Sequence, residues 1–168
     1  MSLDSTLTIR PYRPDDWPHV WAALEPVFRA GETYSFVRDI SEDEAKGVWT
    51  DPPRQTWVAF DTSGTLLGTY YIKPNQPGQG AHICNCGYVV SPSARGRGLA
   101  SKLCEHSQVI AKSLSFHGMQ YNLVVSTNEV AVYVWKKMGF EIVGTIPEAF
   151  DHPRLGLVDC FVMYKKLG

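Results

Sequence analysis

The sequence predicts an α/β (α+β) fold, with one domain over residues 1–168 and a mixed sheet covered by helices. The first observation is length, because a chain of 168 residues fits one domain and buries roughly 70% of the surface that its unfolded form exposes. The second is that no repeat, low-complexity tract or linker divides the chain. The third is the expected order of elements: strand, two helices, three strands, helix, strand, helix and two strands.

The first half of the chain supplies four of these strands and two helices. Alternating residues predict a strand at 6–11, and an amphipathic pattern after Pro14 predicts a helix that ends near Arg29. A capping box at 41–44 starts a second helix that ends near Trp49. Three further strands are expected at 55–60, 65–73 and 82–90, the first two joined by a hairpin turn.

The hydrophobic period changes to that of a helix after Gly96. Leu99, Leu103, Val109, Ile110 and Leu114 mark a third helix. A fourth helix stops before a glycine that suits a helix C-terminus. The remaining elements are expected as a strand at 119–125, the fourth helix at 128–138, and two last strands at 140–146 and 157–165.

The charge balance favours a small-molecule partner. With 16 Lys and Arg against 17 Asp and Glu, a net charge of −1 gives no field that would gather nucleic acid or coat an anionic membrane. The first ten residues lack the apolar stretch of a signal peptide, and no later run approaches the length of a membrane span. The sequence therefore predicts a cytoplasmic protein.

The four cysteines favour reduced thiols over disulfides or a metal site. They are too few and too irregularly spaced for a secreted disulfide scaffold. Cys84 and Cys86 lie two apart in an apolar run, so on a strand they would share one face. A metal site would need a second Cys or His pair at ligand spacing, and none is visible.

A glycine-rich turn at residues 95–101 joins the long strand to the third helix. Gly96 and Gly98 remove side chains where a backbone must approach a ligand, and the N–H groups that begin the helix carry partial positive charge. Arg95 and Arg97 can add charge-assisted hydrogen bonds. The turn therefore suits a pyrophosphate, although a tight connection with two solvated arginines explains the turn alone equally well.

Two common phosphate-binding motifs do not fit this turn. A P-loop ends in Gly-Lys-Ser or Gly-Lys-Thr, which is absent. A dinucleotide-binding turn needs a third glycine where Ser101 stands, and an acidic residue at the end of the next strand, where residues 123–126 offer none. Both alternatives fail on specific residues.

A different pair of motifs fits the chain in the correct order. The pattern R/Q-x-x-G-x-G/A is matched by Arg95, Gly98 and Ala100. The pattern Asn-x-x-Ala-x-x-x-Tyr-x-Lys-x-Gly-Phe is matched by Asn128, Ala131, Lys137, Gly139 and Phe140. Over nearly its whole length the chain resembles the GNAT acetyltransferase superfamily. The resemblance implies a largely antiparallel sheet of about seven strands flanked by about four helices, and N-acetyl transfer with acetyl-CoA as acyl donor.

The resemblance also implies how acetyl-CoA binds. The backbone of Tyr88, Val89 and Val90 would hydrogen-bond the pantetheine arm, and Asn128 would contact the arm from the other side. An N–H near Val89 or Val90 would stabilise the charge that develops on the thioester oxygen. The acyl group would pass directly to the amine, without an acyl-enzyme. The pyrophosphate would be wrapped by Arg95, Gly96, Arg97, Gly98, Leu99, Ala100 and Ser101.

One position departs from the family pattern. The tyrosine that often protonates the departing thiolate is replaced by Trp135, which would border the cofactor but whose indole N–H is a poor proton source. Tyr133 lies two positions away and, on a helix, points to a different face. We therefore expect the proton to come from water or from the amine itself.

A narrower resemblance concerns the acceptor. Segments 31–34, 82–85, 121–124 and 134–140 look like the N-acetyltransferases that detoxify proline analogues such as azetidine-2-carboxylate. In that branch two asparagines line the acceptor pocket, and they match Asn85 and Asn122. An amide can orient an amine or hold a carboxylate without adding a buried charge. Either asparagine alone could equally be a strand-edge or turn amide.

Other residues of the acceptor pocket and a general base are also predicted. Glu32, Tyr34 and Phe36, between the first two helices, are expected to contact the acceptor. Candidates for the base are His82, Glu32 and Asp159, and His82 is the one whose ordinary pKa lies near physiological pH. His82 could instead be a strand-end histidine bonded to a neighbour. The predicted catalytic set is Asn85, Asn122 and His82.

Three functions remain open at this point. The leading hypothesis is acetylation of a small metabolite amine, such as an amino acid or an amino-acid-like toxin. The second is acetylation of a protein N-terminus or lysine, which needs an open peptide groove. The third is a non-catalytic acyl-CoA sensor, which the tryptophan at 135 keeps open. Members of the family often form dimers, so a homodimer is a further expectation.

Overall fold

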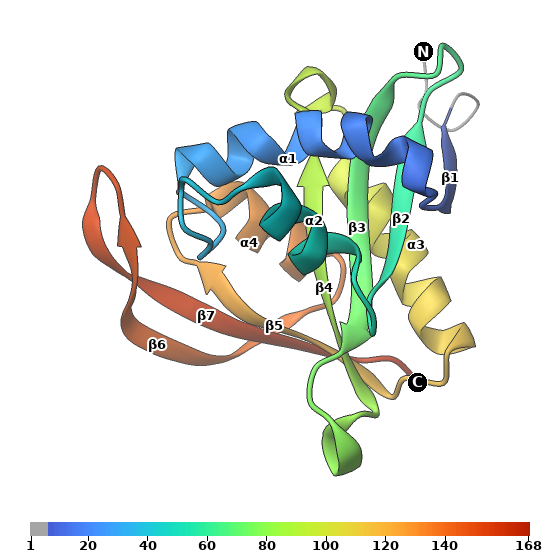
Figure 1. The fold of residues 1–168 in the computed structure, drawn as a ribbon. Helices are drawn as coiled ribbons and strands as arrows, with labels where there is room; N and C mark the ends of the chain where they lie inside the picture. The colour runs from blue at the N-terminus through green and yellow to red at the C-terminus, as the bar shows by residue number, and fades with distance from the viewer. Residues whose placement is uncertain (1–6) are drawn as a thin grey trace.

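The structure is a computed structural model that describes residues 7–168, and its centre is a seven-stranded sheet (Figure 1). The strand order is β1-β2-β3-β4-β5-β7-β6. Every neighbouring pair is antiparallel except β4 and β5, which run parallel. This arrangement confirms the predicted mixed, largely antiparallel sheet.

The elements follow the predicted order, with three short 3₁₀ turns at Pro14–Asp16, Gly78–Gly80 and Pro92–Ala94. The strands are β1 (Thr8–Pro11), β2 (Gln55–Phe60), β3 (Leu66–Pro74), β4 (Ile83–Val90), β5 (Gly118–Val125), β6 (Glu141–His152) and β7 (Gly156–Lys166). The helices are α1 (Trp17–Ala30), α2 (Glu42–Thr50), α3 (Leu99–Ser113) and α4 (Glu129–Lys137).

The last hairpin is longer than the sequence predicted. The strand expected to end at Ile146 continues to His152. Pro147 is tolerated because β6 is the edge strand of the sheet and needs a partner on one side only. A register shift between Ile146 and Phe150 absorbs the proline, and Glu148 takes a positive φ of 51° within it. At the other end of the chain, the first strand begins at Thr8, and the predicted start at residue 6 lies outside the described residues.

The starts of both N-terminal helices are fixed by side chains. At α2, the Glu44 N–H donates to the Ser41 hydroxyl at 3.2 Å and the Ser41 N–H donates to the Glu44 carboxylate at 3.0 Å, which confirms the capping box. Before α1, the Asp16 carboxylate accepts two hydrogen bonds from the Arg10 guanidinium, at 2.7 and 2.8 Å, and one from the Arg13 N–H at 2.7 Å. This ion pair fastens α1 to strand β1.

The helices cover both faces of the sheet and divide the core in two (Figure 1). Helices α1 and α2 pack on one face around Phe28, Trp49 and Val89. Helices α3 and α4 pack on the other, around Leu103 and Met119. The four cysteines are buried and unbonded to one another, as predicted. Among residues 7–168, no helix has the length and apolar character needed to cross a membrane.

Candidate functional site

The two parallel strands at the centre of the sheet separate soon after they meet. Strands β4 and β5 are paired only at Ile83 with Gly118 and at Cys84 with Met119. Beyond these pairs both strands continue, β4 to Val90, without a ladder between them. Because their backbone groups then have no partner strand, the divergence leaves a polar gap in the middle of the sheet.

The pairing of β4 with β3 determines which backbone groups face this gap. The Ser91 N–H donates to the Leu67 carbonyl and the Asn75 N–H donates to the Ile83 carbonyl, both at 2.8 Å. In an antiparallel ladder the direction of these groups alternates, so the odd-numbered residues of β4 face β3. The N–H and carbonyl groups of Tyr88 and Val90 therefore point toward the gap.

The same alternation corrects the prediction for Val89. Its backbone faces β3, opposite Thr69, and its side chain is buried in the core under α1 and α2. Val89 therefore cannot hydrogen-bond a ligand that lies in the gap. Of the two N–H groups considered for the thioester oxygen, only that of Val90 points toward the gap.

The turn after β4 has room for a ligand at its two central glycines. Gly96 and Gly98 have φ values of +73° and +78°, and a Cβ built at either position would meet nothing within 4 Å. Gly98 is also the N-cap of α3 and supplies no side chain to the first N–H groups of that 15-residue helix. With Arg95 and Arg97 exposed beside it, this turn fits a pyrophosphate.

A network of hydroxyl groups bridges the gap on the face covered by α3 and α4. The Tyr88 hydroxyl lies 2.7 Å from that of Ser107 and 2.8 Å from that of Tyr121. The Ser107 hydroxyl donates its hydrogen to the Cys104 carbonyl, so it accepts a hydrogen bond from the Tyr88 hydroxyl. The Tyr88 hydroxyl in turn accepts one from the Tyr121 hydroxyl. Burial raises the pKa of Tyr88 and Tyr121 well above the ordinary phenol value, so both stay neutral.

Trp135 covers this network from α4. Its ring centroid lies 4.9 Å from that of Tyr88 and 5.1 Å from that of Tyr121. Tyr133 is exposed, as expected from its position on the helix. The Asn128 side chain is the N-cap of α4 and accepts a hydrogen bond from the Ala131 N–H at 3.3 Å. The structure therefore brings Trp135 to the gap and gives Asn128 a capping role.

The two predicted asparagines lie on the opposite face, beside β4 and β5. Asn85 Nδ2 donates to the Gln120 carbonyl at 2.9 Å and so bridges the strands where their ladder has ended. Asn122 Nδ2 donates to Asn75 Oδ1 at 2.7 Å, and its Oδ1 accepts from Gln120 Nε2 at 3.0 Å. Because the Gln120 carbonyl can only accept, Asn85 Oδ1 is left as the acceptor, and no residue among 7–168 donates to it.

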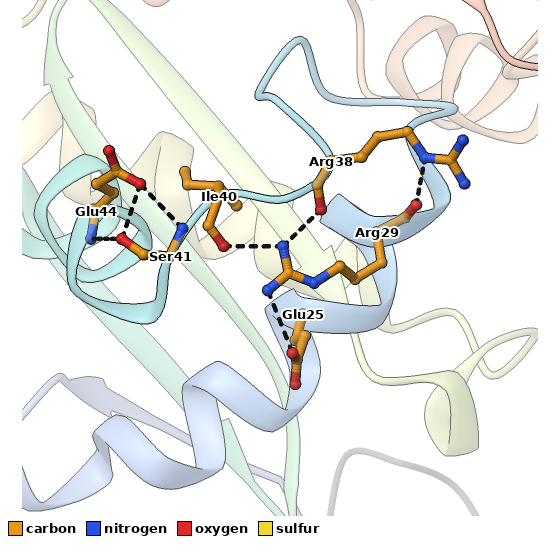
Figure 2. Close-up of polar contacts among 6 residues, drawn as sticks. All are labelled: Glu25, Arg29, Arg38, Ile40, Ser41 and Glu44. Carbon is orange, nitrogen blue, oxygen red and sulfur yellow. Dashed lines mark hydrogen bonds and ion pairs between the residues drawn. The ribbon is translucent and has the colours of Figure 1, made fainter.

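The loop between α1 and α2 brings Tyr34 to the same place. The Tyr34 hydroxyl donates to the Tyr88 carbonyl at 2.9 Å, and its ring stacks on Phe36 with the centroids 5.8 Å apart. Figure 2 shows how this loop is held. The Arg29 guanidinium donates to the carbonyls of Arg38 and Ile40, and Arg38 Nε donates back to the Arg29 carbonyl.

The three predicted base residues do not lie together. His82 is exposed just before β4, next to the short stretch where β4 and β5 are still paired, with its ring centroid 5.9 Å from that of His117. Glu32 forms an ion pair with Arg154 at 2.9 Å. Asp159 Oδ1 accepts a hydrogen bond from the Glu148 N–H at 3.0 Å, in the hairpin of β6 and β7. Their roles stay predictions.

Tyr71 is a site residue that the sequence reasoning missed. It lies opposite Gly87 across β3 and β4, and a Cβ on Gly87 would be 2.6 Å from its ring. The ring therefore covers the strand next to the gap. A glycine inside an apolar strand was the available signal, because such a residue often marks a close approach.

Comparisons with known proteins agree with this geometry. Residues 15–140 match the sequence model of the Acetyltransferase (GNAT) family. The chain is 37% identical over 97 residues to N-acetyltransferase aca1 of Schizosaccharomyces pombe, an alignment of 58% of this chain and 46% of that protein. The chain thus spans less than half the length of this curated relative.

Two solved structures show the same fold. A GCN5-related N-acetyltransferase from Kribbella flavida superposes with a TM-score of 0.93 at 37% identity, over 97% of this chain and 99% of that chain. A phosphinothricin acetyltransferase from Sinorhizobium meliloti, solved with acetyl-CoA, gives a TM-score of 0.84 at 20% identity, over 97% of this chain and 89% of that chain. The chain therefore belongs to the Acetyltransferase (GNAT) family, a family of acetyl-CoA-dependent N-acyltransferases.

Proposed function

We propose that this chain transfers the acetyl group of acetyl-CoA to the amine of a small metabolite, with amino acids and proline analogues as the acceptor class. The observation that carries the proposal is the gap between β4 and β5. Backbone donors of Tyr88 and Val90 point into it, and the accepting oxygen of Asn85 lies beside it. A site of this kind can hold an acyl group and an amine next to each other.

The chain offers separate groups for the parts of acetyl-CoA, which supplies the acyl group as an activated thioester. The turn at 95–101 and the start of α3 would hold the pyrophosphate. The N–H groups of Tyr88 and Val90 both point into the gap, but at about 3.3 Å per residue Val90 lies roughly 16 Å along β4 from Asn85. The N–H of Tyr88, three residues from Asn85, would therefore donate a hydrogen bond to the acyl oxygen and stabilise the negative charge that develops there. The Tyr88 carbonyl also points into the gap, and because it already accepts a hydrogen bond from the Tyr34 hydroxyl, acetyl-CoA would share this acceptor with Tyr34.

Asn85 and Asn122 would orient the acceptor. Asn85 Oδ1 can accept a hydrogen bond from the attacking amine, because its Nδ2 is already held by the Gln120 carbonyl. No ionised group is needed for this contact. Since His82 is exposed outside the start of β4 and the Glu32 carboxylate is paired with Arg154, we infer that the amine attacks in its neutral form and passes its proton to water.

The similarity to a phosphinothricin acetyltransferase supports an acceptor that resembles an amino acid. That protein shares only the fold at 20% identity, so it carries less weight than the asparagines of the site. The relative aca1 carries the name N-acetyltransferase, which supports the reaction type. Both similarities favour acetylation of an amine over a sensor without turnover.

We also propose that the chain forms a homodimer through the hairpin of β6 and β7. Leu155 and Leu157 are 61% and 60% exposed there, at the turn between the two strands and at the start of β7. Exposed apolar side chains gathered on one element are typical of an interaction surface. Sedimentation equilibrium should give twice the chain mass, and Leu157→Ser should shift the equilibrium toward the monomer. A monomeric wild-type protein at micromolar concentration would contradict this proposal.

A thiol-release assay tests the proposed reaction. Acetyl-CoA is offered with azetidine-2-carboxylate, L-proline, phosphinothricin, polyamines and short peptides, to wild type, Asn122→Ala and the control Gln79→Ala. Gln79 is exposed in the loop between β3 and β4. We expect release with a cyclic imino acid, a large loss in Asn122→Ala and no change in Gln79→Ala. Release with peptides alone would favour a protein substrate, and acetyl-CoA binding without release would favour a sensor.

A further inference from the structure

Two cationic side chains lie in the same row of the sheet as Asn85. Lys73 of β3 is the direct partner of Asn85 in β4. On the other side of β3, Gln55 pairs with Ile72, so Arg54 comes level with Lys73. Residues opposite each other in an antiparallel pair project from the same face, and Tyr71, two residues before Lys73, projects from that face as well. The row therefore runs from Arg54 through Lys73 to Asn85.

Neither cation is neutralised by a carboxylate. The ion pairs among residues 7–168 join Arg10 to Asp16, Arg29 to Glu25 and Arg154 to Glu32. Arg54 Nε is buried and has no hydrogen-bond partner in that part of the chain, while its guanidinium carbon lies 5.3 Å from the centre of the Tyr71 ring. Lys73 is only partly exposed.

Two like charges held in this way are unfavourable until an anion joins them. Burial, and secondarily the charge of Arg54, lower the pKa of Lys73. Partial burial of unpaired charge costs free energy, which an anion with matching hydrogen bonds recovers. The fixed guanidinium fork suits a carboxylate, and the lysine ammonium adds a point charge beside it. The chemistry of the pair thus selects a small anionic group.

We propose that Arg54 and Lys73 form a subsite that binds the carboxylate of the acceptor while Asn85 contacts its amine. The proposal rests on the proposed acetyl transfer and names what that acceptor must carry. Neighbouring strands lie about 4.8 Å apart, so the long side chains of Arg54 and Lys73 can reach a ligand held at Asn85. In an α-amino or α-imino acid the nitrogen and the carboxylate are bonded to the same carbon atom. A nitrogen held at Asn85 therefore places the carboxylate close enough for these two side chains to reach it.

The test compares two ligands that differ in charge and hardly in size: azetidine-2-carboxylate and azetidine-2-carboxamide. Binding is measured by titration calorimetry in saturating coenzyme A, which has no acetyl group to transfer. The proteins are wild type, Arg54→Gln, Lys73→Gln and the control Lys112→Gln, which removes the same charge from an exposed site on α3. Thermal melts followed by circular dichroism confirm that each variant is folded.

We expect wild type and Lys112→Gln to bind the acid at least tenfold more tightly than the amide. Arg54→Gln and Lys73→Gln should each weaken binding of the acid tenfold or more and leave the affinity for the amide unchanged. The subsite is overturned when wild type does not bind the acid, binds acid and amide equally, or when the variants lose both ligands in parallel.

Thiol release separates this result from the proposed reaction. Selective binding of the acid without release from acetyl-CoA would keep the subsite and remove the proposed transfer. Release with uncharged amines, without preference for the acid, would keep the transfer and remove the subsite. Thiol release from acetyl-CoA together with a preference for the acid would support both the proposed transfer and the subsite.

Discussion

Adding one methyl group at Gly87 should disturb the acceptor side of the site through Tyr71. In Gly87→Ala the new Cβ would lie 2.6 Å from Tyr71 Cε1 and 2.8 Å from Cζ, where ordinary carbon contacts are about 3.5–4.0 Å. The ring must therefore move by about 1 Å. Overpacking of this kind costs about 1–3 kcal/mol. For a domain of this size, that loss lowers the melting temperature by roughly 3–10 °C.

Gly144→Ala is the matched control, because a Cβ at Gly144 in β6 meets nothing within 4 Å. Thermal melts should separate the two variants, and replacing Tyr71 by Leu in the Gly87→Ala background should recover part of the loss. In the thiol-release assay, Gly87→Ala should raise the KM for the acceptor and leave the affinity for acetyl-CoA unchanged. Equal melting temperatures for the two alanine variants would refute the close approach of Tyr71.

Three further results are expected. Arg29→Leu removes the clamp on the loop that carries Tyr34 and should raise the acceptor KM severalfold, whereas Glu25→Gln, which loses only an exposed ion pair, should change neither KM. The Arg10 hydrogen bonds, with other contacts, hold the pKa of Asp16 below its usual range, so its stabilisation is present above the ordinary carboxyl pKa and lost as pH falls through the lowered one. Asp16→Asn should therefore cost about 1.5–3 kcal/mol at pH 7 in urea unfolding and flatten the loss of stability in acid. Burial raises the pKa of Cys86, Cys104 and Cys160, so the native protein should react slowly with a thiol reagent and show four thiols in urea; fast reaction of the native protein would contradict their burial.

The local signals in the sequence were sufficient for the helices and most strands. The capping box at Ser41 and the glycine after α4 act within one turn, so they can be identified without the fold. The glycine-rich turn was equally visible, because its proposed role in binding pyrophosphate depends on the backbone conformation at Gly96 and Gly98. Such features need no knowledge of distant contacts.

Features that depend on how neighbouring strands pair could not be predicted from the sequence in this way. The exclusion of Val89 from the gap follows from which residues of β4 pair with β3, and the sequence does not state that pairing. The row from Arg54 to Asn85 likewise joins residues from separate strands. The continuation of β6 past Pro147 was unpredictable for a related reason, because the proline is tolerated only since β6 is an edge strand.

The most direct test of the central claim is the initial rate of thiol release by wild type and Asn85→Ala. The two proteins are compared side by side at varied azetidine-2-carboxylate and saturating acetyl-CoA. If the amine lies against Asn85 Oδ1, the variant should lose at least tenfold in kcat/KM for the acceptor and bind acetyl-CoA as wild type does. Unchanged turnover in the variant, or a loss confined to acetyl-CoA binding, would contradict an acceptor site at the gap between β4 and β5.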